Sequence, residues 1–466
     1  MKKALVGVFI IIVISLFGFQ CTSLDKREVL ENPWDNPVSL DLDEIVKRGY
    51  IRAVVDNSST SYYIYRGRRM GYEFEMLRSL AKHLGVKLHL IVKSDIKEAF
   101  KLLNKGTADI IAMNLEVTDA RSKMANFTTP LGQMGTVLVQ RKDGDPAKDF
   151  WELQGKVLHI RKDAVYRAQL DQIQEAYGIE FSIMEGQGDN EFFIQKVVNK
   201  EIDFTVVDRV EALVNATYYN SLDIDFEISP KSDVAWAIRK NAPELEIAVN
   251  QWIENGRSSG YINTVYAKYF KNSKNSYFRN NSPFSSLAGN SISPYDEIIK
   301  RGSEDLGWDW RLLASLVYKE SRFDTTAISY AGAVGLLQLM PVTLERFGVE
   351  NPNDPFESLM GGVSYLKYLD RFWRARIPEA NERIKVILAS YNIGHGHVED
   401  AWKLTIKYGG NPQNWESIAT FLQLKTDPMY YRDPVVRSGY AKGHLAVNYV
   451  DDIMILYDSY RVLIDP

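Results

Sequence analysis

The sequence predicts two domains of different class, an α/β domain followed by a mainly helical domain, and three observations carry this prediction. The chain has 466 residues, which is more than a single compact core usually accommodates. Strand-like and helix-like runs alternate from residue 41 to residue 271, and such alternation is typical of α/β folds with largely parallel strands. Beyond residue 295 the apolar spacing is helical almost throughout.

The stretch between the two domains, residues 272–294, is rich in Asn and Ser, contains two prolines and has no periodicity. This composition is typical of a linker. We therefore expect the α/β domain to span residues 41–271 and the helical domain to span residues 295–466.

Apolar spacing and glycine stops predict the individual elements. In the first domain they predict helices over 72–85 and 96–106, strands over 50–55, 87–93 and 108–113, and a helix followed by a strand within 192–208. In the second domain they predict helices over 295–306, 309–321, 336–347, 355–375, 381–391 and 443–461.

The overall charge argues against one class of partner. The chain carries 56 basic and 60 acidic residues, a net charge of −4, and no domain is strongly basic. Nucleic-acid-binding domains usually carry a clear excess of Lys and Arg. We therefore expect no nucleic-acid partner.

The N-terminus resembles a lipoprotein signal. Lys2 and Lys3 precede an uncharged run from Ala4 to Gln20, and the only cysteine of the chain, Cys21, follows. A short apolar run behind two lysines is typical of an export signal. The resemblance implies that residues 1–21 end at a lipidated Cys21, with residues 22–40 as a tether. An uncleaved inner-membrane anchor and a buried structural cysteine are the alternatives.

Glu320 has an unusual place in the pattern of the second domain. Leu313, Leu316, Val317 and Glu320 follow the spacing i, i+3, i+4, i+7 and so share one helix face. A carboxyl group in apolar surroundings has a raised pKa, and a carboxylic acid that stays protonated near neutral pH can donate a proton to a leaving group. The alternative is an exposed glutamate at the helix end that pairs with Arg322.

Four short motifs place this domain in a family. In order and spacing they resemble the motifs of the soluble-lytic-transglycosylase family of lysozyme-like domains, and they are "KES" (319–321), "GLLQLMP" (335–341), "ASYNIG" (389–394) and the weaker "NYV" (448–450). Leu337 replaces the usual Met, and Ser390 stands between Ala389 and Tyr391. The resemblance implies a mainly α, lysozyme-like domain that cuts the MurNAc–GlcNAc β-1,4 bond of peptidoglycan without water.

The resemblance also implies how one carboxyl group suffices. Glu320 would protonate the leaving oxygen and then take a proton from the C6 hydroxyl of the sugar, which attacks C1 and closes a 1,6-anhydro ring. Glycosidases that use water or a covalent intermediate need two carboxylates. Asp324 is the only nearby candidate for a second one, and we expect it to be a solvated or capping residue instead.

The remaining residues of the proposed glycan site follow from the same resemblance. Tyr391 is expected to orient Glu320. Ser321 is expected either to form a hydrogen bond near Glu320 or the substrate, or to cap the helix. Met340 is expected either to line the site or to pack in the core. The full set expected to bind substrate is Ser321, Gly335, Gln338, Met340, Tyr391, Asn392 and Tyr449.

We expect no metal and no cofactor. His395 and His397 in "GHGH" could be a pair of metal ligands, but their i, i+2 spacing without nearby Cys or clustered carboxylates suits zinc poorly.

The first domain resembles the extracellular solute-binding family that captures amino acids and related molecules. The segments that carry the resemblance are 71–92, 103–130, 201–208 and 265–270. The family fold is a two-lobed, periplasmic-binding-protein-like α/β domain whose lobes are joined by two crossover strands and close on a ligand. Residues 155–166, which open the second lobe, depart from the family pattern.

The resemblance implies a set of ligand contacts in this domain. Arg121 would bind the ligand's carboxylate with its planar fork, or else form a surface ion pair with Asp119. Asp208 would take an amino group, Thr118 would add a hydroxyl, and Tyr62 and Tyr63, with Tyr65, would form an aromatic lid. The expected ligand is an amino acid, a peptide or a muropeptide, and the second lobe's departure from the family pattern leaves open which of these binds, or whether the lobe binds nothing.

Together, the two domains behind a lipid anchor resemble the F type of membrane-bound lytic murein transglycosylases. The expected protein is a peptidoglycan lytic exotransglycosylase, held by its lipid on the periplasmic side of the outer membrane or, alternatively, the inner membrane. The solute-binding domain is expected to modulate it. A hydrolase on the same fold and a non-catalytic wall-binding or solute-binding lipoprotein are the alternatives.

Overall fold

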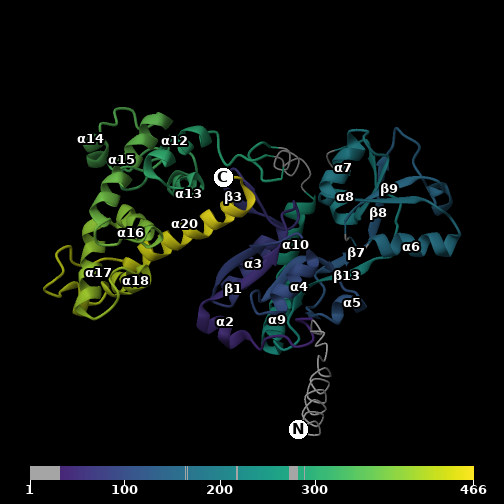
Figure 1. Cartoon of the computed structure of the whole chain (residues 1–466), viewed down its shortest axis with the longest axis horizontal. Coiled ribbons are helices and arrows are strands. Elements are labelled where there is room, and N and C mark those ends of the chain that lie inside the picture. The colour runs from purple at the N-terminus through teal and green to yellow at the C-terminus, as the bar shows by residue number, and fades with distance from the viewer. Residues whose placement is uncertain (1–31, 163, 165, 217–218, 272–281, 288) are drawn as a thin grey trace, which may run out of the picture.

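The computed structural model describes residues 32–162, 164, 166–216, 219–271, 282–287 and 289–466. The predicted export signal, with Cys21, lies outside these residues, as do parts of the predicted tether and linker. Figure 1 shows three bodies in a row: a helical domain, a first α/β lobe in the centre and a second α/β lobe at the other end.

The first lobe is built on a sheet in the strand order β4-β1-β5-β13-β6, with β7 beside β13. The strands β1, β4 and β5 are parallel, as the sequence predicted, whereas β13 is antiparallel to β5. Their bounds are β1 Tyr50–Val55, β4 Lys87–Val92, β5 Ile110–Glu116, β6 Asn126–Phe127, β7 Gly132–Met134 and β13 Ser232–Ile238. The helices are α2 Leu42–Arg48, α3 Tyr72–His83, α4 Ile96–Asn104, α5 Asp119–Ser122, α9 Pro243–Ser258 and α10 Tyr261–Tyr266.

The second lobe has a five-stranded sheet in the order β10-β9-β11-β8-β12. Its elements are β8 Thr136–Arg141, β9 Val157–Arg161, α6 Tyr166–Tyr177, β10 Ser182–Gly186, α7 Asn190–Val198, β11 Phe204–Asp208, α8 Arg209–Ala216 and β12 Leu222–Asp223. The chain passes between the lobes twice, from β7 into β8 and from β12 back into β13. The backbone N–H of Ile228 donates to the oxygen of Thr136 at 2.8 Å where the two passages meet. This confirms the two-lobed fold with two crossovers.

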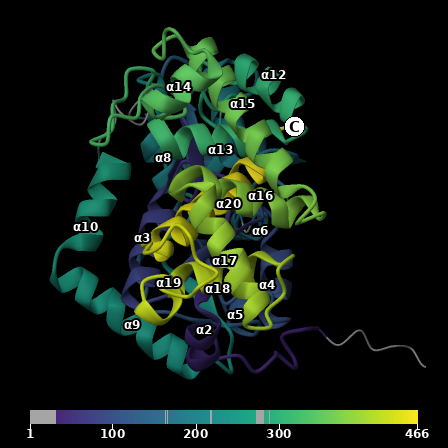
Figure 2. The same ribbon diagram turned by 90° about the vertical axis from the view of Figure 1, so that its left-hand side faces the viewer.

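The helical domain consists of α12 Asp296–Leu306, α13 Trp310–Ser321, α14 Pro341–Phe347, α15 Pro355–Trp373, α16 Ala380–Ile393, α17 His395–Lys407, α18 Trp415–Leu424, α19 Pro428–Tyr431 and α20 Gly443–Leu463. The predicted helix over 336–347 is wrong in its first half, because the chain there forms a tight turn and the helix begins only at Pro341. A proline favours the first position of a helix, where its missing N–H costs nothing. Figure 2 shows this domain in front of the first lobe.

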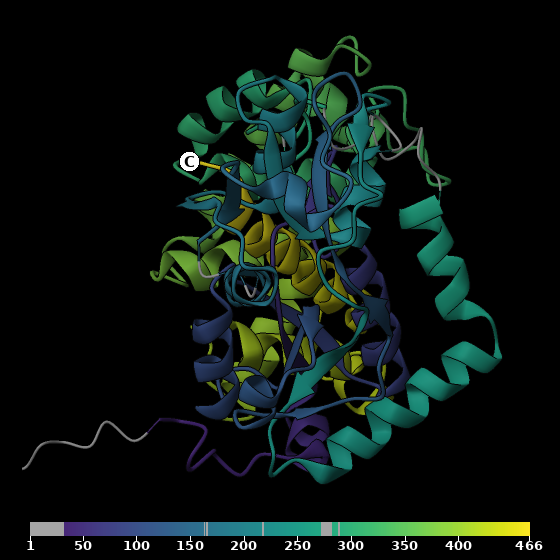
Figure 3. The ribbon, with the colours of Figure 1, turned by 90° about the vertical axis from the view of Figure 1, so that its right-hand side faces the viewer.

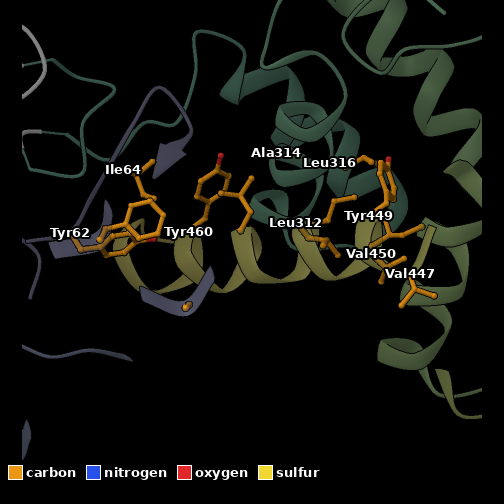
Figure 4. Close-up of a cluster of buried hydrophobic side chains, with 14 of the residues drawn as sticks. Tyr62, Ile64, Leu312, Ala314, Leu316, Val447, Tyr449, Val450 and Tyr460 are labelled. Atoms are coloured by element: carbon orange, nitrogen blue, oxygen red, sulfur yellow. The ribbon is translucent and has the colours of Figure 1, made fainter. Parts of the chain in front are cut away.

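The last helix, α20, joins the two domains. Near its start, Tyr449 and Val450 pack with Leu316 of α13, and near its end Tyr460 packs with Tyr62 of the first lobe (Figure 4). The buried residues of both domains thus form one continuous apolar cluster. Figure 3 shows, from the opposite side, how α9 and α10 follow the edge of the molecule toward the connection between the domains.

A two-stranded hairpin of the first lobe, β2 Tyr63–Tyr65 and β3 Arg68–Met70, contacts the helical domain. Gly67 lies in its turn, and the Tyr460 hydroxyl donates to the Gly67 carbonyl at 2.6 Å. A Cβ on Gly67 would lie 2.6 Å from a ring atom of Phe323 and 2.8 Å from one of Tyr318. The hairpin turn therefore packs against Tyr318 and Phe323, which lie on either side of Glu320 in the sequence.

Residues 282–287, a part of the predicted linker that the structure describes, form hydrogen bonds with the same hairpin. The N–H of Arg66 donates to the Phe284 carbonyl and the N–H of Ser286 to the Ile64 carbonyl, both at 2.9 Å. Among the described residues, none of the helices is both long enough and apolar enough to cross a membrane.

The hairpin contact generates a prediction with a matched control. Replacement of Gly67 by Ala is expected to lower the free energy of unfolding by about 2–4 kcal/mol, because the residue has a φ of 72° and the added methyl group would overlap three aromatic side chains. Gly85→Ala, at a φ of 70° with open space around it, is expected to cost only about 1–2 kcal/mol. Urea unfolding of both variants would measure the difference, and equal losses would contradict the contact.

Candidate active site and ligand cleft

Glu320 lies in the last turn of α13, a helix that begins at the Asp309 cap and presents Leu313, Leu316 and Val317 to the core. Its carboxyl is half-buried, and burial raises its pKa to about 7. A carboxyl group at this pKa is partly protonated at neutral pH and can both donate and accept a proton. This is the protonation state that the sequence pattern predicted.

Tyr449 is the direct partner of Glu320. Its hydroxyl donates to Glu320 Oε1, and its ring is buried where α20 packs on α13. Hydrogen bonding to the charged form lowers the pKa of a carboxyl group, so Tyr449 offsets part of the effect of burial. Tyr449 therefore both orients the carboxyl and limits how far its pKa rises.

The role expected for Tyr391 needs correction. Its hydroxyl donates to the carbonyl of Leu337 at 2.6 Å, because α16 carries it to the turn that precedes α14. The nearby Glu320 carboxylate helps to raise the Tyr391 pKa, so the ring lies close to the carboxyl. The residue that orients Glu320 is nevertheless Tyr449.

The turn over 335–340 forms a second wall. Gly335 has a φ of 79°, and a Cβ there would lie 2.3 Å from the Pro352 oxygen, so only glycine fits. Gln338 has a φ of 46°, and its side-chain amide donates to the oxygens of Ala327 and Gly335 at 2.9 and 3.0 Å. A left-handed non-glycine residue is costly and is often found at functional sites.

The other predicted substrate residues differ in exposure. Ser321 is buried and donates to the Val317 carbonyl at 3.3 Å, which favours a structural role over a bond to Glu320. Met340 is 45% exposed at the start of α14, and Asn392 is exposed at the end of α16. Ser390, the departure from the family motif, is fully buried and accepts a hydrogen bond from Trp373 at 2.9 Å.

Asp324 does not serve as a second carboxylate. It is exposed, and the hydroxyl and N–H of Thr326 donate to it at 2.7 and 2.9 Å, which lowers its pKa. Apart from burial, the groups that shift the pKa of Glu320 are Tyr449 and Lys319. Asp324 is not among these groups.

His395 and His397 have other partners. His395 packs edge-on against Phe372 at 5.1 Å, and the ring of His397 lies 3.2 Å from the ammonium of Lys425. Among the described residues there is no group of three or more His, Cys, Asp or Glu side chains that could hold a metal ion.

In the solute-binding domain, Arg121 is buried and donates to the Glu116 carbonyl at 2.8 Å. It is therefore no surface partner of Asp119. Burial lowers the Arg121 pKa, and the carboxylates of Glu116 and of Asp208 in the second lobe oppose this shift, so the two predicted ligand contacts lie near each other on the two lobes. Thr118 caps α5 by accepting the N–H of Arg121 at 3.3 Å.

Sequence reasoning missed most of the charged groups in this cleft. Burial raises the pKa of Asp208 to about 6 and that of Glu191 to about 7, and it also raises the pKa values of Asp56 and Glu211. Ser59 of the first lobe donates to Glu191 of the second. The one signal in the sequence was the departure of residues 155–166 from the family pattern, because this segment contains Arg161, whose guanidinium faces these carboxylates.

The predicted aromatic lid is not formed by Tyr62 and Tyr63. Both are at most 1% exposed and belong to the cluster between the domains, where Tyr62 lies 5.5 Å from Phe74. Their predicted role is not supported, because both side chains are buried in this cluster. Tyr65 is half-exposed in the same hairpin.

Comparisons with known proteins agree with both halves of the chain. Residues 51–272 match the model of bacterial extracellular solute-binding proteins, family 3, and residues 297–414 match the transglycosylase SLT domain. Solved structures similar to the first half include the ancestral amino acid-binding protein AncCDT-1, at 25% identity and a TM-score of 0.43, covering 49% of this chain and 98% of that one. The chain is thus a solute-binding domain joined to a lytic transglycosylase domain.

Full-length relatives show the family. The chain is 32% identical over 437 residues to the membrane-bound lytic murein transglycosylase F of Desulfosudis oleivorans, covering 93% of each chain. It is 31% identical to the protein of the same name from Aeromonas salmonicida, covering 90% of this chain and 84% of that one. This chain belongs to the membrane-bound lytic murein transglycosylase F family.

The raised pKa of Glu320 predicts a pH-dependent effect on stability. Because the folded pKa of about 7 exceeds the ordinary value of 4.5, ionisation of Glu320 opposes folding increasingly above pH 4.5 and fully above pH 7. Glu320→Gln is therefore expected to raise the free energy of unfolding by about 2 kcal/mol at pH 8, with little change at pH 4. Urea unfolding at both pH values would test this, with exposed Glu345→Gln on α14 as the control. A gain independent of pH would contradict it.

Proposed function

We propose that this chain cleaves the MurNAc–GlcNAc β-1,4 bond of peptidoglycan without water, with Glu320 as the single acid and base. The observation that carries the proposal is a lone half-buried carboxyl with a pKa near 7, held by Tyr449. Family membership supports a peptidoglycan lytic transglycosylase with a solute-binding domain.

The chemistry balances with one carboxyl group. Protonated Glu320 gives its proton to the glycosidic oxygen as the bond from C1 of MurNAc to that oxygen breaks. The C6 hydroxyl oxygen of the same sugar then bonds to C1, and the Glu320 carboxylate takes the hydroxyl proton. The products are a 1,6-anhydroMurNAc end and a free GlcNAc hydroxyl, and Glu320 returns to its protonated state. The exposed position of Asp324 disfavours the hydrolytic alternative, which requires a second placed carboxylate.

The walls of the site suit a sugar strand. Gln338 is held rigidly by its two backbone bonds, Gly335 keeps the turn tight, and exposed Asn392 and Met340 offer an amide and an apolar surface. We assign these residues, with Tyr391, to the binding of the glycan. Ser321 is assigned to the support of the helix end that carries Glu320.

The solute-binding domain is proposed to modulate the enzyme. Its cleft combines buried Arg121 with Asp208 and several more carboxylates, which suits a ligand with both a carboxylate and amino groups, such as an amino acid, a peptide or a muropeptide. The hairpin turn at Gly67 connects this domain to Tyr318 and Phe323 beside the catalytic helix end. A change in the position of the first lobe would therefore act directly on Glu320.

We place the protein in the cell envelope, since its relatives are named as membrane-bound. We propose that a lipid on Cys21 attaches the protein to the outer membrane. We also propose that the enzyme cleaves glycan strands from their ends.

Digestion of purified sacculi by the full chain and its Glu320→Gln variant tests the chemistry. Anhydro-muropeptides are expected from the wild-type protein, with a loss of at least about 1,000-fold in the variant, since general acid and base catalysis are both removed. The control Asp324→Asn is expected to retain activity within about three-fold. Reducing-end products would show a hydrolase, and no product from any form would show a binding protein.

Calorimetric titration of the full chain with amino acids, stem peptides and muropeptides tests the ligand cleft. At least one ligand is expected to bind, and Arg121→Ala is expected to weaken it by 10-fold or more, because a buried charged partner is lost. Asp119→Ala, beside it on α5, is the control. Absence of heat with every ligand would refute a small-molecule role for this domain.

A further inference from the structure

A groove of about 690 Å³ lies between the two domains, separate from the cleft between the lobes. One side is formed by the hairpin and α3 of the solute-binding domain, and the other by the end of α13 and the middle of α20. Six cationic side chains line it: Arg66, Arg68, Arg69, Arg78, Lys319 and Arg322.

The charge of this groove is largely uncompensated. Its one carboxylate, Asp452, bonds to Lys319 at 2.7 Å, and none of the five arginines has a carboxylate within 4 Å among the described residues. Four of these arginines are exposed. In a chain of net charge −4, such a concentration of like charges opposes the association of the two domains unless an anion neutralises it.

Two of the guanidinium groups lie over one aromatic ring. Arg69 and Arg78 both lie over the ring of Phe74, at 5.0 and 5.8 Å from its centroid. Stacked guanidinium groups keep their N–H edges free for planar, two-pronged bonds to carboxylates. The groove therefore presents donors suited to several carboxylate groups.

The groove begins beside the catalytic carboxyl. Lys319 precedes Glu320 in the chain, and its ammonium lies 5.8 Å from the ring centroid of Tyr449. Asp452 follows Tyr449 by three residues on α20, which places it about one helical turn further on. A strand bound at Glu320 would thus have this groove within reach of its substituents.

We propose that the groove binds the carboxylates of the peptide stems carried by the glycan strand in the active site. This inference rests on the proposed function, and it adds that the enzyme recognises the peptide stems of its substrate. The sugars of peptidoglycan are mostly uncharged, whereas each stem carries several carboxylates. The cations lie on both domains, so a bound stem also bridges the solute-binding domain to the catalytic domain.

The test uses the full chain and the double variant R68Q/R78Q, which removes two exposed charges from side chains that are not themselves members of the buried interdomain cluster. The control R371Q/K142Q removes two exposed cations elsewhere. Initial rates are measured on soluble glycan strands with intact stems and on strands freed of stems by an amidase. The groove variant is expected to lose about 10-fold or more in kcat/KM on stem-bearing strands and to match the wild type on stem-free strands, with the control unchanged on both.

Three results would overturn the inference. The first is that R68Q/R78Q and the wild type have equal rates on both substrates, and the second is that the variant loses the same fraction of its rate on both. The third is that the variant loses only its binding to phosphatidylglycerol vesicles, which would assign the groove to lipid headgroups. If the wild-type protein cuts neither substrate, the proposed function fails. Sedimentation of R68Q/R78Q and the wild type with intact and stem-free strands would then still decide whether the groove recognises stems.

Discussion

Removal of one carboxyl group from water is the constraint on which the rest of this structure depends. Glu320 has a useful pKa because α13 and α20 bury it, and it keeps a defined orientation because Tyr449 on α20 bonds to it. The apolar stripe of α13 and the length of α20 follow from this requirement. A glutamate at the same helix end without that cover would be ionised at neutral pH and useless as an acid.

The helix α20 serves both domains at once. Tyr449 near its start fixes the catalytic carboxyl, and Tyr460, three turns later, bonds to the hairpin turn at Gly67. Because α20 carries both tyrosines, it connects the catalytic carboxyl to the solute-binding domain. The hairpin also contributes three of the six cations of the groove, so the proposed substrate recognition and the domain contact share this short segment.

Much of this structure could be predicted from the sequence. Periodicity identified β1, α3, β4 and most of the helices, and the position of Glu320 on an apolar stripe indicated its raised pKa. Periodicity failed at 336–340, since Gln338 adopts a left-handed conformation that apolar spacing does not report. The roles of Tyr391 and Tyr449, the burial of Tyr62 and the carboxylates around Arg161 depend on contacts between residues far apart in the chain, which local pattern does not encode.

The seating of Gly67 on Tyr318, Phe323 and Tyr460 has a consequence for any attempt to separate the two halves of the chain. A polypeptide that starts at the linker would leave these rings facing solvent, and exposed aromatic patches promote self-association. It would also lack the hairpin that steadies the end of the helix bearing Glu320. The catalytic half in isolation would therefore present an aromatic surface that the hairpin covers in the intact protein.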